Sequence, residues 1–387
     1  MTRRICFVRQ AGYPDELSVR REVETLHRAG FETHVICLGG GNQKHEEVVN
    51  GVYVHRIPLA RKKTSIVRYL YDYLLFFFLA ALKLTTLYLR CPFNAIQINT
   101  MPDFLVFAAF VPKLLGAKVV VMMHEPVPEL WQTLYNSPPP RILKIAEQSA
   151  LAYVDAALTV TQQLKDTYVS RGANPNKISV ILNVPESRFL ELENAGENAM
   201  EDSEHFTLIS HGAIEERYGH DTMLEAVALI KSQIPGLRLR ILGQGSYQEK
   251  FLALISQMGL EDCVQYLGWV PLFQMIQELR AADVGIVAQK SSPYSNLVHT
   301  GKMYEFIALG KPVLASRLKS VEAYFPEDAL YYFEPGNAES LAQGIWDLYQ
   351  HPAKRRALVE NAQKLYDQYK WEKQKEIYLS VYRALLD

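Results

Sequence analysis

Residues 295–316, SNLVHTGKMYEFIALGKPVLAS, have the pattern of a loop, a short helix, a glycine stop and a strand. We expect the helix to begin near Gly301 and to end before Gly310, which stands where a left-handed C-terminal cap belongs. Pro312 cannot continue a helix, and the apolar residues after it have strand character. The run 283–288, DVGIVA, predicts another strand just before this stretch.

One acid and one base lie on this otherwise apolar helix. Glu305 is surrounded in sequence by apolar residues, and Lys302 lies three residues before it, on the same helical face. Free N–H groups at the start of the helix, at 299–302, favour an anion. This combination predicts a sugar-phosphate ligand. The alternative is a surface Lys302–Glu305 pair on a core helix, and the stretch by itself leaves both open.

Length and composition bound the class of protein. The chain of 387 residues is long enough for two to three domains, and its 49% hydrophobic and 21% charged residues are typical of a soluble globular protein. The formal net charge of -1 gives no reason to expect nucleic acid as a partner. The four scattered cysteines indicate reduced thiols, and the N-terminus lacks the long apolar region of a signal peptide, so we expect a cytoplasmic protein.

Short apolar strands alternate with helical patterns along the whole chain. This order predicts an α/β fold with two doubly wound, Rossmann-like domains that face one another across a cleft. The polar, acidic stretch 186–204 is the predicted linker. We expect an N-terminal, acceptor-side domain over 1–185, a C-terminal, donor-side domain over 205–370, and a C-terminal helix, 371–387, able to pack back on the N-terminal domain.

The segment 69–89, YLYDYLLFFFLAALKLTTLYL, is apolar enough to raise the question of whether it spans a membrane. Its uninterrupted apolar core, 74–82, is nine residues long, whereas a spanning helix needs about 20, so we expect it not to span. It is either an ordinary buried helix or a helix at a membrane surface, and both can hold for different faces. The basic run 61–63 and Arg68 favour peripheral membrane contact through 61–89.

Several candidate residues follow predicted strands, at the edge where a doubly wound sheet binds its ligands. Gly12, after the first strand, would allow close backbone approach, but its loop is not a G-x-G-x-x-G fingerprint, which argues against a dinucleotide oxidoreductase. His124 either contacts a substrate hydroxyl or caps its strand. Glu125 and Glu129 are candidate acceptor contacts.

The second half has similar loops. Arg217 suits bidentate phosphate binding, unless the adjacent Glu215 or Glu216 neutralises it. The loops at Gly243 and Val270 would face the same edge. The sequence has no typical metal-ligand spacing. We therefore expect no metal, and a pyrophosphate neutralised by Arg, Lys and helix N–H groups.

The chain resembles the retaining nucleotide-sugar glycosyltransferases of the GT-B fold, group 1 or family 4 (GT4). The resemblance covers nearly the whole chain and rests on four stretches: SVRREVETLHRAGFETHVICL, MPDFLVFAAFVPKLLGAKVVVMMHEPVPELW, HGAIEERYGHDTMLEAV and GKMYEFIALGKPVLAS. The last of these is the most specific.

The resemblance implies roles for individual residues. Glu305 would bind the ribose hydroxyls, His124 would contact the transferred sugar, and Val270 would sit beside the base. The implied catalytic group is His124, Arg217, Lys302 and Glu305. The implied donor-binding set is Gly12, Gly212, Arg217, Gly243, Val270, Asn296, His299, Thr300, Gly301, Lys302 and Glu305, with the backbone at 299–302 on the phosphates.

Two positions depart from the family pattern. Leu297 stands where the family often has a first glutamate that touches sugar hydroxyls, and Asn296 or Thr300 would take its place. Tyr218 stands where a lysine is usual, so Arg217, together with Lys302, would supply the positive charge.

The implied function is retaining transfer of a sugar from a nucleotide diphosphate sugar to an acceptor hydroxyl, without a cofactor, in surface polysaccharide or glycolipid assembly. The acceptor would be a glycan or lipid-linked, at the inner face of the cell membrane. Alternatives are a non-catalytic nucleotide-sugar sensor or scaffold, or another GT-B enzyme such as a nucleotide-sugar epimerase or a phosphorylase.

Overall fold

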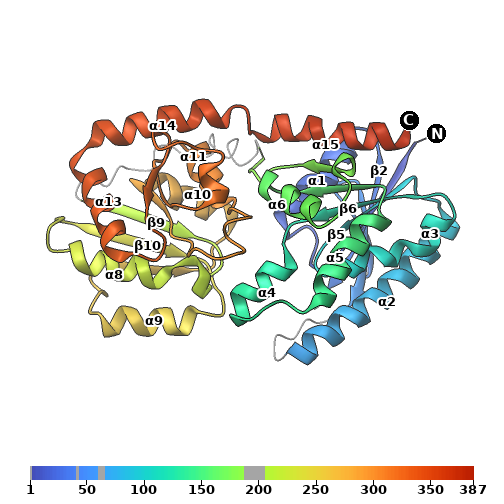
Figure 1. Ribbon diagram of the computed structural model, residues 1–387, viewed down its shortest axis with the longest axis horizontal. Coiled ribbons are helices and arrows are strands. Elements are labelled where there is room, and N and C mark those ends of the chain that lie inside the picture. The colour runs from blue at the N-terminus through green and yellow to red at the C-terminus, as the bar shows by residue number, and fades with distance from the viewer. Residues whose placement is uncertain (1, 41–42, 60–65, 187–204) are drawn as a thin grey trace. The chain divides into compact units, whose positions relative to one another are not determined.

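The computed structural model describes residues 2–40, 43–59, 66–186 and 205–387, and has two compact units (Figure 1). Unit 1 contains Met1–Asn183 and Gln374–Asp387, and unit 2 contains Val184–Lys373. Each unit has a Rossmann-like α/β architecture with a parallel sheet, which confirms the predicted fold class. All of the predicted linker after Glu186 lies outside the described residues.

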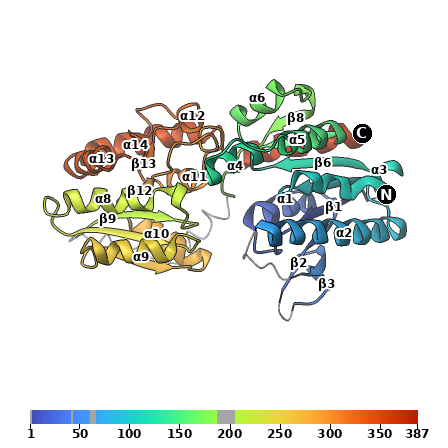
Figure 2. The same cartoon turned by 60° about the horizontal axis from the view of Figure 1, so that its bottom comes forward.

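Within the described residues, unit 1 has an eight-stranded sheet in the order β3-β4-β2-β1-β5-β6-β7-β8. All neighbours are parallel except β3 and β4, and β3 forms one edge (Figure 2). The central strands are short and rich in Val and Ile because a parallel sheet is covered on both faces. The strands are β1 Arg4–Arg9, β2 Glu32–Gly39, β3 Glu46–Val49, β4 Val52–Pro58, β5 Ala95–Asn99, β6 Lys118–Met123, β7 Ala156–Thr159 and β8 Ile178–Val180.

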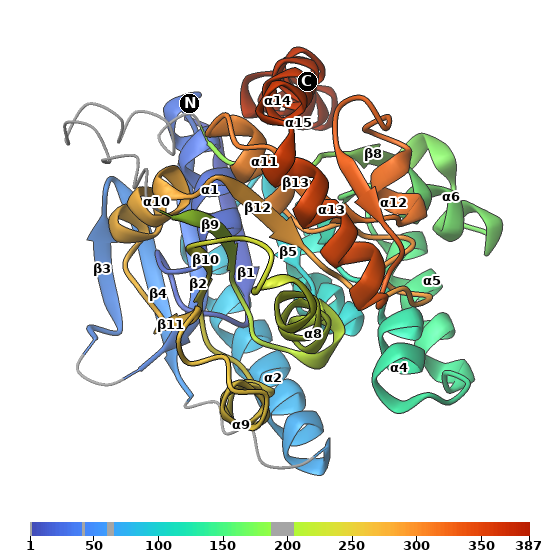
Figure 3. The ribbon, with the colours of Figure 1, turned by 90° about the vertical axis from the view of Figure 1, so that its left-hand side faces the viewer.

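Helices cover both faces of this sheet (Figure 3). Gln97 of β5 points to the face of α1 and α15, since its amide donates to Glu22 at 2.7 Å and its Oε1 accepts from Tyr378 and Tyr382 at 2.6 and 2.5 Å. Right-handed crossovers place the helices between β4 and β8 on the opposite face. The helices are α1 Leu17–Arg28, α2 Ile66–Arg90, η1 Asp103–Ala109, α3 Phe110–Leu114, α4 Val127–Tyr135, α5 Arg141–Tyr153, α6 Gln162–Ser170, η2 Pro175–Lys177 and α15 Trp371–Leu386.

Unit 2 has a parallel sheet in the order β11-β10-β9-β12-β13-β14. Its strands are β9 Phe206–His211, β10 Leu237–Leu242, β11 Val264–Gly268, β12 Val284–Val287, β13 Val313–Ser316 and β14 Tyr331–Phe333. Its helices are η4 Glu216–Tyr218, α8 His220–Ile230, α9 Gln248–Gln257, α10 Leu272–Ala281, α11 Lys302–Ala308, α12 Lys319–Glu322, α13 Ala338–Gln350 and α14 Pro352–Tyr366.

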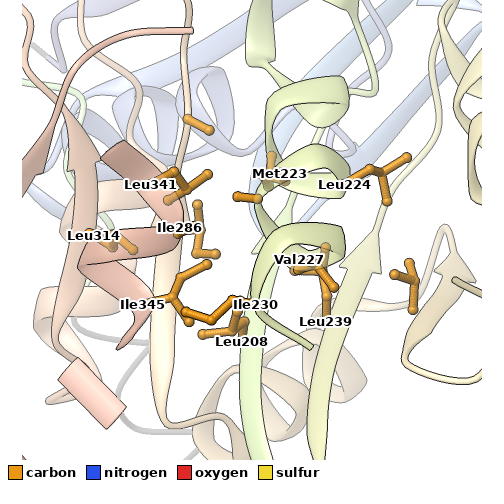
Figure 4. Close-up of a cluster of buried hydrophobic side chains, with 14 of the residues drawn as sticks. Leu208, Met223, Leu224, Val227, Ile230, Leu239, Ile286, Leu314, Leu341 and Ile345 are labelled. Atoms are coloured by element: carbon orange, nitrogen blue, oxygen red, sulfur yellow. The ribbon is translucent and has the colours of Figure 1, made fainter. Parts of the chain in front are cut away.

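The core of unit 2 lies between the sheet and the helices α8 and α13 (Figure 4). Helix α8 contributes Met223, Val227 and Ile230, which are spaced to lie on one face. Ile286 of β12 points into this core. Its neighbour Gly285 points to the other face, where a Cβ would lie 2.4 Å from the Phe306 ring of α11. This close contact sets α11 directly against β12.

The structure differs from the sequence-based prediction at two places in unit 1. The apolar stretch 104–115 before Gly116 predicts one helix, whereas the structure has a 3₁₀ helix, η1, followed by the short α3. Strand β3 was missed because its four residues, EEVV, are too short for a periodic signal. In unit 2, the strand predicted over 283–288 is observed as β12, Val284–Val287.

A buried carboxyl marks the first residue of η1. Asp103 is 4% exposed, and its Oδ1 has no hydrogen-bond partner among the described residues. Burial, and secondarily the carboxylate of Glu147, raise the pKa of Asp103 to about 8. The folded state therefore holds this proton more tightly than the unfolded chain does.

We predict that Asp103→Asn stabilises the protein at pH 8 and has little effect near pH 4. The pKa of Asp103 is higher in the folded state than in the unfolded chain. The contribution of the protonated acid to the free energy of unfolding is therefore lost as pH rises from about 4 to about 8, on the order of 1 kcal/mol per pH unit. Urea unfolding at several pH values measures this. Asp155→Asn is the control of opposite sign, because Lys113 pairs with Asp155 and lowers its pKa. A less stable Asp103→Asn at pH 8 would contradict the assignment.

Candidate functional site

The candidate site of unit 2 lies where the strand order of its sheet reverses. From β9 the chain proceeds to β10 and β11 on one side, and then returns to β12 on the other side. Ligands of doubly wound sheets bind beyond the carboxyl ends of strands at such a switch point. The loop 212–219 follows β9, and the loop 288–301 follows β12. The N–H of Lys290 donates to the carbonyl of Arg217 at 2.9 Å, which joins the two loops.

Gly212 allows a lysine to approach the end of β9. Its φ is +103°, and a Cβ there would lie 2.5 Å from Cε and 2.9 Å from Nζ of Lys302. Gly243, at the end of β10, packs against the backbone of Gly212. A Cβ at Gly243 would lie 1.8 Å from the carbonyl oxygen of Gly212. Both positions therefore require glycine, and the predicted residues Gly212, Gly243 and Lys302 are brought together.

Two cations lie close to one aromatic ring in this site. Nζ of Lys302 lies 4.3 Å from the centroid of the Tyr218 ring, and Cζ of Arg217 lies 4.9 Å from it. Burial lowers the pKa of Lys302 to about 8; Glu305 opposes this shift, and Arg217 adds to it. Tyr218, which replaces the lysine expected from the resemblance, thus holds two other cations by their attraction to its ring.

The acidic neighbours of Arg217 were an open question from the sequence. The Glu215 carboxylate accepts hydrogen bonds from the N–H of Ser246, at 3.3 Å, and from its hydroxyl. The carboxylate of Glu215 thus binds the loop that follows β10. These hydrogen bonds join that loop to the loop that follows β9.

Glu305 lies on the first turn of α11, and its side chain is 21% exposed. Nε2 of His211 lies 3.0 Å from Oε2 of Glu305, and the His211 ring packs edge-on against Phe306 with centroids 5.3 Å apart. His211 was not among the site residues predicted from the sequence. The only signal for it was its place at the end of β9, directly before Gly212.

The predicted anion site at 299–302 is only partly supported by geometry. Helix α11 begins at Lys302 and has seven residues, so its dipole is small. His299 is 6% exposed, and its ring joins the Ser320 carbonyl, at 2.8 Å, to the Tyr304 hydroxyl, at 3.0 Å. Burial lowers the pKa of His299 to about 4. The Thr300 hydroxyl accepts from the N–H of Lys302 at 3.3 Å, beside the helix-capping residue Gly301.

The predicted sugar-side residue Asn296 is held inside its loop. Its amide donates to Ser291 and Ser292 at 3.1 and 3.0 Å, and its Oδ1 accepts from the N–H of Lys319 at 3.2 Å. A donor sugar would have to compete with these bonds. Val270 is half-buried after β11, next to Trp269, which is 67% exposed.

In unit 1, His124 follows β6 at the carboxyl edge of the sheet. Its Nε2 is buried, with no hydrogen-bond partner among the described residues. Burial, together with the nearby charges of Arg9 and Arg21, lowers the pKa of His124 to about 3, so its imidazole is neutral at pH 7. The half-buried Gly12 lies in the loop after β1, at the same edge.

The two predicted acceptor residues differ in their surroundings. Glu129 of α4 is ion-paired with Arg171, which also binds Glu147 at 2.9 Å, so its carboxylate is used within unit 1. Glu125 is half-buried directly after His124. Across the described part of the chain, no three His, Cys, Asp or Glu side chains gather in a group that could hold a metal ion.

Two family models match the chain. Residues 16–184 match "Glycosyltransferase Family 4", and residues 194–365 match "Glycosyl transferases group 1". Among curated proteins, the chain is 28% identical over 155 residues to the lipopolysaccharide core biosynthesis glycosyltransferase LpsE of Rhizobium meliloti, covering 40% of this chain and 42% of LpsE. It is 28% identical over 140 residues to the putative colanic acid biosynthesis glycosyltransferase WcaL of Escherichia coli, covering 36% and 34%. The aligned stretches thus span less than half the length of these relatives.

Solved structures are similar over nearly the entire chain. Sucrose-phosphate synthase from Thermosynechococcus elongatus has a TM-score of 0.80 at 19% identity and covers 99% of each chain. Anabaena HepE in complex with UDP-glucose has a TM-score of 0.72 at 15% identity and covers 98% of this chain and 99% of its own. These likenesses show a GT-B fold, as the sequence predicted.

We predict that Gly212→Ala destabilises the protein by about 1–3 kcal/mol, because the new methyl group meets the Lys302 side chain at a strained φ. Urea unfolding measures this. Gly116→Ala is the matched control, since its φ is +105° and no atom lies within 4 Å of the added Cβ.

A double-mutant cycle isolates the contact. In a Lys302→Ala background, Gly212→Ala should cost no more than Gly116→Ala does. An unchanged cost in that background would show that Lys302 does not occupy the space above Gly212.

Proposed function

We propose a specific activity for this chain, which belongs to the group 1 glycosyltransferases of family 4: it moves a sugar from a nucleotide diphosphate sugar to an acceptor hydroxyl, with retention of configuration. The single observation that carries this proposal is the pair of cations, Lys302 and Arg217, which lie 4.3 and 4.9 Å from the centroid of the Tyr218 ring. A diphosphate needs paired positive charge, and a guanidinium and an ammonium at the end of β9 supply it.

In the proposed reaction, the bond between the sugar C1 and the diphosphate oxygen breaks, and the acceptor oxygen bonds to C1 on the same face. The acceptor proton passes to the departing phosphate. Lys302 and Arg217 stabilise the negative charge that develops on this phosphate. Glu305, which lies beside His211, binds the ribose hydroxyls, and the neutral His124 contacts the transferred sugar.

We propose that these cations replace a metal ion. Two positive charges close to the diphosphate neutralise it in the way a divalent cation does. Turnover that is unchanged by a chelator would support this proposal, and loss of turnover that is restored by Mg²⁺ or Mn²⁺ would refute it.

We further propose a role in surface polysaccharide or glycolipid assembly, at the cytoplasmic face of the membrane. The names of LpsE and WcaL, which refer to lipopolysaccharide core and colanic acid, support this proposal. A glycan or lipid-linked acceptor agrees with the apolar α2 and with peripheral membrane contact through 61–89, of which 61–65 lie outside the described residues.

We predict that one nucleotide sugar among UDP-, GDP-, ADP- and CMP-sugars raises the melting temperature without added metal, because a ligand of the folded state stabilises it. The shift should be lost in Glu305→Ala. Arg217→Ala should lower turnover by about 10²-fold or more. Arg317→Ala, which removes a surface arginine bound to Glu322 and Glu327, is the control.

The same panel separates the alternatives. Donor binding without turnover over a broad set of acceptors would favour a sensor or scaffold. Turnover without an acceptor would favour an epimerase, and turnover that requires inorganic phosphate would favour a phosphorylase.

We predict that nucleotide affinity falls as pH rises above about 8. Free Lys302 has a pKa of about 8, and a bound diphosphate favours its charged form, so binding above this pH requires proton uptake. The dissociation constant of the matching nucleoside diphosphate should rise by about tenfold per pH unit. Calorimetry in buffers of different ionisation enthalpy measures the uptake directly.

Lys302→Arg is the matched variant, because arginine stays charged over this pH range. It should bind nucleotide with a nearly flat profile from pH 7 to 10. The same fall in both proteins would assign the titration to another group.

A further inference from the structure

Exposed apolar side chains concentrate on one face of unit 1. Of the 22 large apolar residues that are exposed in the described chain, six lie on α2, four lie at 110–115 and four lie at 134–145. The helices that carry them, α2, α3, α4 and α5, follow β4, β5 and β6, and lie on the face opposite α1 and α15 (Figures 1 and 3). We call the residues of α2, 110–115 and 134–145 the docking face.

Helix α2 is apolar on two opposite sides. Phe76, Ala80 and Leu84 are fully buried and attach the helix to unit 1. Phe78 and Leu82, half a turn away, are 65% and 67% exposed. A helix that only covered a core would be polar on this outer side. We call this exposed apolar side of α2, which carries Phe78 and Leu82, the outer stripe. It indicates that α2 contacts a second apolar surface besides the core of unit 1.

The outer stripe continues onto α3. The Tyr88 hydroxyl of α2 donates to the carbonyl of Leu115 at 3.0 Å, so the end of α3 lies beside the end of α2. At this end Leu89, Leu114 and Leu115 are 67%, 71% and 55% exposed. The apolar surface is thus contiguous over two helices, and is larger than scattered surface residues produce.

The charges of the docking face have one sign. Its exposed charged side chains among the described residues are Arg90, Arg141 and Lys144. The carboxyl of Asp72 is 2.9 Å from Arg68 and 3% exposed, so it does not counter the basic side chains. At the start of α5, the basic Arg141 and Lys144 alternate with Ile142 and Ile145, which are 64% and 58% exposed. Apolar side chains interleaved with basic ones match an anionic lipid surface.

Helix α2 is also long and apolar enough to cross a bilayer, by length and composition alone, which differs from the expectation from its short uninterrupted run. Its inner side argues against crossing. Lys83 is ion-paired with Glu46 of β3 at 2.5 Å, and the buried stripe packs into unit 1. A spanning helix would have to break this pair and expose the core of unit 1.

We propose that the docking face lies flat on an anionic lipid bilayer, with the outer stripe of α2 and the end of α3 in the acyl boundary and with Arg141 and Lys144 among the headgroups. This inference deepens the proposed function by naming the partner surface of unit 1. The experiment measures lipid binding and not turnover. The membrane proposal can therefore fail while the enzymatic proposal stands.

The test is co-sedimentation of the full chain with vesicles of phosphatidylcholine alone and of phosphatidylcholine with phosphatidylglycerol. We expect binding to the anionic vesicles that weakens in high salt. Phe78→Ser with Leu82→Ser should weaken it at least about tenfold, because two apolar side chains that the bilayer would bury are removed. Arg141→Glu with Lys144→Glu should abolish the preference for anionic vesicles.

Ile377→Ser is the matched control, since Ile377 is 42% exposed on α15, on the other face of unit 1. It should bind as the unchanged chain does, and an unchanged nucleotide-induced thermal shift shows that each variant is folded. Equal vesicle binding by the Phe78 and Leu82 variant, or none by the unchanged chain, would overturn the proposal. A dimer that dissociates in the variant would assign the face to a second copy. Resistance of membrane-bound protein to alkaline carbonate would assign α2 to a spanning helix.

Discussion

The close approach of the Lys302 side chain to the backbone of Gly212 is the contact on which the site of unit 2 depends. It requires a residue without a side chain at the end of β9, and Gly243 must then be small as well, because it packs on the Gly212 carbonyl. The approach also brings α11 to the edge of the sheet, where Phe306 packs on Gly285. Chain geometry at three strand positions is thus fixed by the need to hold one charged side chain in one place.

Holding that charge has an electrostatic cost that the surroundings partly offset. Burial lowers the pKa of Lys302, and Glu305 and the face of the Tyr218 ring favour its charged form. Arg217 opposes it. Two cations that lie close together repel one another, and an anion bound between them would relieve this repulsion. This repulsion therefore favours an anion over a neutral ligand.

The sequence predicted where chemistry would gather, but not which atoms would be free to perform it. Strand periodicity and the glycine stops placed Gly212, Gly243 and Lys302 at one sheet edge, and the structure brings them together. Side-chain partners depend on tertiary packing, which a linear pattern does not contain. For this reason only the structure shows the bonds that hold Asn296 and Glu129 and the contact of His211 with Glu305. The same is true of the 3₁₀ helix η1.

Helix α2 shows why hydropathy alone cannot assign a helix to its surroundings. A core helix, a spanning helix and an interfacial helix can all have this composition, and they differ in which sides are covered and by what. Here one side is covered by unit 1, and the opposite side, carrying Phe78 and Leu82, is not. Contact of these apolar side chains with water is unfavourable. Insertion of α2 into the bilayer centre is unfavourable as well, because it would place the charged Lys83 and its partner Glu46 in hydrocarbon. A flat position at the bilayer surface satisfies both sides of the helix, because the boundary between water and acyl chains is itself two-sided.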